Sequence, residues 1–143
     1  GNSSANSTIN STALVVNNAV ISNLTVASLS LGSSVSIGGY VDSYFTVSTS
    51  SAVNQPVDSF LLGTYRSAEY NLQIRDSANN VQLSKLLVVT DGTDAYMTEY
   101  GIITSNNTMG VFSTTVNSTA VILSFLPTLA NNVIKAVRKT IVI

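Results

Sequence analysis

The sequence contains no cysteine and no histidine. Without cysteine the chain can form no disulfide, no zinc–thiolate site and no cysteine nucleophile. Without histidine it lacks the commonest general base, the Ser-His-Asp triad and the commonest metal ligand. Tryptophan is also absent, although sugar-binding clefts rely heavily on large aromatic side chains. These absences predict a protein that is not an enzyme and that binds neither a metal nor another cofactor.

Charged residues are scarce: they make up 9% of the 143 residues, against roughly 25% in an average soluble protein. The basic residues form no stripe, so we expect no nucleic-acid partner. The one local cluster, Lys135-Arg138-Lys139, indicates a solvated face of a strand. No run of about 18 apolar residues could span a bilayer, so we expect no membrane segment. A surface with so few charges is typical of a subunit that shares it with neighbours, because net charge keeps free monomers apart.

The first 41 residues carry no charge at all, and every Asp, Glu, Lys and Arg lies from Asp42 onward. Within this stretch, apolar pairs two residues apart recur every five residues. Residues two apart share one face of a strand, and so few repeats need stacked neighbours to bury that face. We interpret residues 1–41 as an extended β arm for attachment or oligomerisation; the alternative is one or two plain strands, at 13–21 and 24–31. The pairs are Leu14/Val16, Ala19/Ile21, Leu24/Val26 and Leu29/Leu31.

Residues 42–143 predict a globular domain of short strands joined by turns. Turn-forming stretches at 76–80, 91–94 and 105–110 separate segments with strand patterns, and no segment shows a helical period. The predicted fold is therefore all-β: an antiparallel, jelly-roll-like β-sandwich with an extended N-terminal β arm. We expect strands at 44–49, 59–62, 68–75, 81–90, 95–104, 111–116, 120–126 and 132–143.

Two of these segments, 86–89 and 121–123, are apolar at consecutive positions and therefore on both faces of a strand. Successive side chains of a strand point to opposite sides of the sheet. A strand of this kind needs a cover on each side. We expect the second cover to be another sheet or another subunit.

Carboxylates are the remaining candidates for chemistry. Glu69 and Glu99 lie in predicted strands, and two carboxylates about 5–9 Å apart suffice for glycoside hydrolysis. We interpret both as exposed strand residues instead, and we interpret Asp91-Gly92-Thr93-Asp94 as a hairpin turn rather than a calcium loop. A receptor or host surface glycan would be recognised by tyrosines, although alternation places Tyr96 and Tyr100 on one face that we take to be core. The candidate recognition residues are Tyr65, Tyr70, Tyr96 and Tyr100.

Two stretches of the domain carry a family resemblance. The first is Tyr65-Arg66-Ser67-Ala68-Glu69-Tyr70; the second runs from Asp91-Gly92-Thr93-Asp94 to Thr98-Glu99-Tyr100-Gly101. Together with the C-terminal strand at 133–143, they resemble a domain of structural proteins of marine tailed bacteriophages, notably those that infect cyanobacteria. The resemblance covers about residues 42–143, and its motifs are structural rather than catalytic.

The resemblance implies a non-enzymatic virion protein, on the capsid surface or in a tail or fibre. It implies assembly with copies of itself, as a homotrimer, and with other virion proteins such as the major capsid protein or a tail protein. We favour capsid decoration, as a cement protein, because a compact domain with a short clasping arm suits a surface lattice. The alternative is a tail or vertex fibre, or a receptor- or glycan-binding tip.

Overall fold

The computed structural model describes residues 20–23, 25–26 and 28–143. The chain divides into two units, residues 1–30 and 31–143. The described residues of the first unit form no strand or helix. Its apolar residues Ile21, Val26 and Leu29 are exposed, as is Leu31 at the start of the second unit. The role of the arm stays a prediction, and its residues Leu14, Val16 and Leu24 lie outside the described residues.

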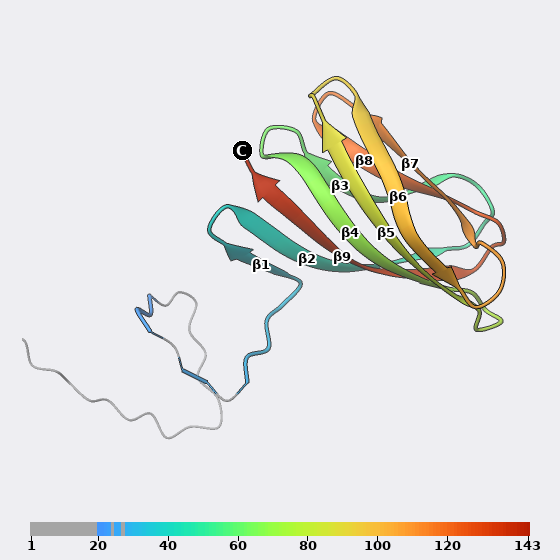
Figure 1. Cartoon of the computed structure of the whole chain (residues 1–143), viewed down its shortest axis with the longest axis horizontal. Coiled ribbons are helices and arrows are strands. Elements are labelled where there is room, and N and C mark those ends of the chain that lie inside the picture. Colours follow the sequence, from blue (N-terminus) through green and yellow to red (C-terminus); the bar gives the residue numbers. More distant parts are fainter. Residues whose placement is uncertain (1–19, 24, 27) are drawn as a thin grey trace, which may run out of the picture. The chain divides into compact units, whose positions relative to one another are not determined.

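The second unit is an antiparallel β-sandwich (Figure 1). Its larger sheet, which we call sheet A, has the strand order β1-β2-β9-β4-β5-β6, and the smaller sheet B has the order β3-β8-β7. The predicted all-β, antiparallel sandwich is confirmed. The strands are β1 (Ser34–Ile37), β2 (Tyr40–Thr49), β3 (Gln55–Leu61), β4 (Tyr65–Arg75), β5 (Val81–Thr90), β6 (Ala95–Thr104), β7 (Gly110–Val116), β8 (Ala120–Pro127) and β9 (Asn132–Val142).

The eight predicted strands all appear, and β5 and β6 have the predicted bounds. Strand β1 was not predicted, and it lies inside the stretch that we interpret as the arm. It pairs with β2 across a two-residue turn at Gly38 and Gly39. Gly38 has a φ of 59°, a conformation that glycine adopts without steric cost. Sheet A therefore begins at Ser34, before the predicted boundary at residue 42.

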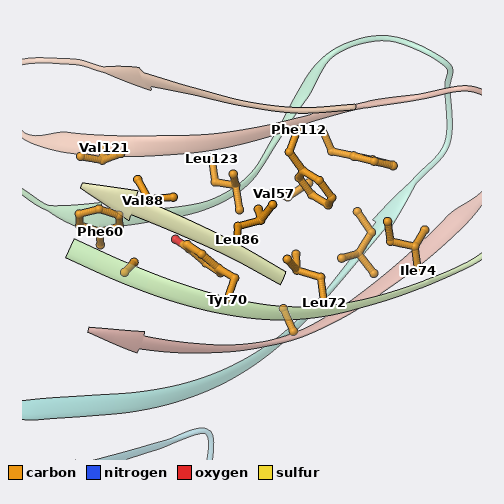
Figure 2. Packing of buried hydrophobic residues seen from close by; sticks show 14 of the residues in the cluster. Val57, Phe60, Tyr70, Leu72, Ile74, Leu86, Val88, Phe112, Val121 and Leu123 are labelled. Atoms are coloured by element: carbon orange, nitrogen blue, oxygen red, sulfur yellow. The ribbon is translucent and has the colours of Figure 1, made fainter. Parts of the chain in front are cut away.

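The core lies between the two sheets and follows strand alternation. Tyr70, Leu72 and Ile74 of β4 point inward and are fully buried. They face Val121, Leu123 and Phe125 from β8 and Phe112 from β7, as Figure 2 shows for the labelled members of the cluster. The rings of Phe112 and Phe125 lie 4.7 Å apart. Burying a side chain of this size contributes roughly 1.5–3 kcal/mol to the stability of the fold. Sheet B therefore stabilises sheet A by covering its inner face.

Candidate interaction surface

Strand β5 is apolar on both faces, and only one face is covered in the described part of the chain. Leu86 and Val88 point toward sheet B and are 0% and 3% exposed. Leu87 and Val89 point away from it and are 45% and 50% exposed. The same side-chain types thus occur on both sides of one strand. The sequence predicted that this strand needs a cover on each face, and sheet B is the cover on the inner face.

Strands β6, β9 and β2 also carry outward apolar side chains, whereas the outward positions of β4, which lies between β5 and β9, are polar. Val89 lies opposite Tyr96 of β6, and Leu83 lies opposite Ile103. Toward the other edge of the same face, beyond β4, Tyr44 of β2 lies opposite Val137 of β9. Each of these side chains is at least 41% exposed. We call this surface the outer face of sheet A; its apolar residues are Tyr44, Leu83, Leu87, Val89, Tyr96, Tyr100, Ile103, Val137 and Ile141.

A hollow of about 550 Å³ lies on this face. Its apolar lining comes from Leu87, Val89, Tyr96 and Ile141, with further contributions from neighbouring positions of β4, β5, β6 and β9. Glu69 and Lys139 are its charged lining residues. A volume of this size falls within the range of about 300–1,000 Å³ in which proteins bind small molecules or anchoring side chains.

Charges of both signs cross the outer face in one row. Lys139 of β9 lies opposite Asp42 of β2 on one side and Glu69 of β4 on the other. These charges lie next to one another in the register, and no ion pair joins Lys139 to either carboxylate among the described residues. The ammonium of Lys139 also lies 5.5 Å from the centre of the Tyr40 ring, within reach of a cation–π interaction. The apolar face is therefore crossed by a charged row with both acids and bases.

The candidate recognition tyrosines do not lie together, and Tyr70 does not belong to a surface at all. It is fully buried, its ring packs edge-on against Phe45, and its hydroxyl donates a hydrogen bond of 2.9 Å to Asp58 Oδ2. Burial, with the nearby Asp58 carboxylate, raises the pKa of Tyr70 above its usual range. Tyr65 is half-buried and packs against the core. Alternation alone does not distinguish the covered face of β4 from its outer face.

Tyr96 and Tyr100 share a face, as predicted, but that face is not core. They are 57% and 41% exposed on the outer face of sheet A. The core interpretation was wrong because the apolar pattern indicates a need for cover, and sheet B covers the opposite side. Tyr96 donates a hydrogen bond of 3.4 Å to Asp91 Oδ2, and the carboxylates of Asp91 and Asp94 raise its pKa.

The two glutamates considered for glycoside hydrolysis point to opposite sides of sheet A. Glu69 lies opposite Leu87, which lies opposite Thr98, so these three residues share the outer face. Glu99 is the next residue along β6 and lies opposite the buried Leu86. The register therefore excludes a catalytic pair formed by these two carboxylates.

The Asp91–Asp94 stretch forms the hairpin turn between β5 and β6. Asp91 Oδ1 accepts hydrogen bonds of 2.8 Å from the backbone N–H groups of Thr93 and Asp94, and these bonds lower the pKa of Asp91. Gly92 adopts a φ of 103°, which favours glycine. Within the residues that the structure describes, no group of three or more acidic, histidine or cysteine side chains could hold a metal ion. No helix in that part of the chain is long and apolar enough to cross a membrane.

Arg138 does not lie on the predicted solvated face. It points toward sheet B, where its Nη1 donates hydrogen bonds of 2.8 Å to Asp58 Oδ2 and 2.7 Å to the carbonyl of Ser59. Asp58 also accepts the hydroxyl of Tyr70, so one carboxylate joins β4 and β9 of sheet A to β3 of sheet B. Strict alternation from the buried Ile134 and Ala136 would have placed Arg138 on the inner face.

No family model matches this chain, and no curated protein matches it. Among the solved structures that are similar to it are two tailspike proteins of bacteriophages. The tailspike protein of Acinetobacter phage vB_ApiP_P1 has a TM-score of 0.43 and 17% identity, over 87% of this chain and 25% of that chain. Tailspike protein gp49 of Acinetobacter baumannii bacteriophage Fri1, described as a capsular polysaccharide depolymerase, has a TM-score of 0.42 and 15% identity, over 71% of this chain. The chain spans 25% and 17% of their lengths.

These comparisons correct one expectation and bear on another. The expectation that the chain is no enzyme is contradicted, because a polysaccharide depolymerase such as gp49 is an enzyme. The missing histidines and tryptophans exclude only chemistry that needs those side chains, and glycoside hydrolysis by carboxylates needs neither. Both of these structures are described as tailspike proteins. Neither comes from a marine phage by its description.

Proposed function

We propose that this chain is part of a virion protein of a tailed bacteriophage, of the tailspike or tail-fibre kind, and that it works by assembling with other polypeptide chains. The observation that carries the proposal is the outer face of sheet A, where large apolar side chains on four strands, β2, β9, β5 and β6, are exposed on both sides of the polar outward positions of β4. Exposed apolar patches beyond a few hundred Å² are uncommon on free monomers and mark interaction surfaces. The tailspike class is that of both similar structures.

The composition supports an assembled state. A net charge of −1 on 143 residues gives little electrostatic repulsion between copies. Burying apolar surface contributes about 25 cal/mol per Å², so the outer face provides a driving force that charge does not oppose. The uncharged residues that precede sheet A serve in this proposal as the attachment to the rest of the particle, and the resemblance to phage structural proteins favours three copies.

The mass of the full chain in solution tests the assembly. Sedimentation velocity over a wide range of protein concentrations is expected to show one discrete oligomer, of three copies if the resemblance holds. A single copy at the highest concentration would contradict the proposal. Labelling of intact virions with an antibody against residues 42–143 tests the location: we expect label at the tail, and label spread over the capsid would contradict the tail assignment.

A further inference from the structure

We infer that the outer face of sheet A is covered by a second copy of this chain, with the hollow formed by Leu87, Val89, Tyr96 and Ile141 as the anchor of the contact. The inference rests on the proposed function and names the surface and the occupant that the assembly uses. Hot spots of interfaces are enriched in tyrosine and cluster in well-packed pockets near the centre of a larger contact. The hollow combines such a pocket with an exposed tyrosine ring.

The size of the face fits a contact between two copies. It extends over the five strands β2, β9, β4, β5 and β6 and along β4 from Ser67 to Arg75. With strands about 4.8 Å apart and a rise of about 3.3 Å per residue, this surface measures about 700 Å². Two copies would bury about 1,400 Å² together, within the roughly 1,200–2,000 Å² of stable protein–protein interfaces.

The charges of the face suit a copy of itself. Both acids and bases lie among the outward positions, so a rotated copy can place acids over bases. A partner with charges of one sign would instead oppose like charges somewhere on the face, which costs affinity. The charged residues are Asp42, Glu69, Arg75, Lys85, Lys135 and Lys139.

The outer face of sheet B lacks these features. Its apolar pair, Val111 and Leu126, is followed along the sheet by the pair Ser113 and Ser124. No charge and no tyrosine lie on the outward positions of β7 and β8. Beyond the serines lie the apolar residues Ile122 of β8 and Leu61 of β3. The polar pair interrupts this smaller apolar surface, and this face provides a control surface on the same molecule.

Leu87→Lys and Leu126→Lys in the full chain form a matched pair of variants, because both leucines are 45% exposed. A lysine at position 87 lies opposite Glu69 in its own copy, so the fold tolerates it. Against a second copy its charge would lose water, and self-association should weaken by about a hundredfold or more. Leu126→Lys should associate like the wild type. Sedimentation measures the association, and circular dichroism checks that both variants are folded.

A second measurement does not depend on whether the folded chain tolerates a lysine at position 87 or 126. Because the chain has no cysteine, a single cysteine introduced by Thr98→Cys or Ser113→Cys can carry a spin label at one defined place. Both positions are exposed, on the outer faces of sheets A and B respectively. In the oligomer we expect an immobilised label at position 98 and a mobile label at position 113.

The outcomes separate the inference from the proposed function. A wild-type chain that stays a single copy contradicts the proposed function. A wild-type oligomer that Leu87→Lys leaves intact, or a label at position 98 that stays mobile in it, overturns only the inference. Equal loss of association in Leu87→Lys and Leu126→Lys also overturns it, because the contact would then not be specific to sheet A.

Discussion

Leu86 and Leu87 are neighbours in β5 and chemically identical, yet one is completely buried and the other is 45% exposed. Val88 and Val89 repeat the contrast at 3% and 50%. The inner residues pack against sheet B, whereas the outer residues have cross-strand neighbours but no second layer over them in the described part of the chain. An apolar residue in a strand therefore indicates that its face of the sheet must be covered. The structure that covers it comes from elsewhere in the chain or from another molecule.

The charged residues of β9 show the same contrast between the two faces. Arg138 on the inner face is held by short hydrogen bonds to Asp58 and to the carbonyl of Ser59. Lys139 on the outer face has only cross-strand neighbours and the ring of Tyr40. A charge between two sheets requires specific partners because it has lost most of its water, whereas a charge on an open face keeps its hydration.

The largest expected difference between the two faces is that between Leu86→Ala and Leu87→Ala. Leu86→Ala should lower the free energy of unfolding by about 4 kcal/mol, because it removes buried apolar surface and leaves a cavity. Leu87→Ala should change it little at low protein concentration, and should lose only the part of the stability that rises with concentration. Urea denaturation at several concentrations measures both. Similar losses at low concentration would break the comparison.

Asp58→Asn should lower the free energy of unfolding by about 3 kcal/mol, because it leaves the guanidinium of Arg138 without its counter-charge between the sheets. The value is at the low end for buried pairs since the two side chains keep 14% and 15% exposure. The matched change on the outer face, Glu69→Gln, should cost no more than about 1 kcal/mol. Chemical denaturation measures the two variants side by side, and a larger loss in Glu69→Gln would contradict the contrast.

The smallest expected effect is a dependence of stability on alkaline pH. The pKa of Tyr70 is raised in the folded chain, so its contribution is fully present below the unfolded value of about 10. Above that pH the unfolded chain ionises while the folded chain does not, and stability falls. Tyr70→Phe should remove this part of the fall. Tyr96→Phe should remove less, because water screens the charges around the exposed Tyr96. Denaturation between pH 9 and about 11 tests the difference, and identical slopes in the two variants would contradict it.

Most of the fold could be predicted because its strands have local signals. Alternating residues and Asp- and Asn-containing turns place β5 and β6 to the residue and the end of β4 at Arg75, although β4 begins three residues before its predicted start. Strand β1 has no such signal, since four residues with two serines pair only because the glycine turn returns the chain to β2. Eight strands are therefore readable from short stretches of sequence, and the ninth depends on its partner.

The candidate surface could be predicted only in part. The doubly apolar pattern of β5 indicated a missing cover, and this indication leads to the outer face of sheet A. Tyr70 was wrongly included among the candidate recognition residues. It lies in a sequence pattern similar to that of Tyr96, but the two tyrosines lie on opposite faces of sheet A. The Asp58, Tyr70 and Arg138 cluster joins residues 80 positions apart, and no local pattern connects them.

The sequence by itself determined which side chains share a face of each strand, because the two-residue period of an extended chain is a local property of the backbone. It also determined that two strands, at 86–89 and 121–123, need a cover on both sides. Only the tertiary structure decided which face is inside, because that depends on where β3, β7 and β8 pack. Burial of apolar side chains stabilises the fold only where two surfaces pack together, and here the two surfaces come from segments far apart along the chain.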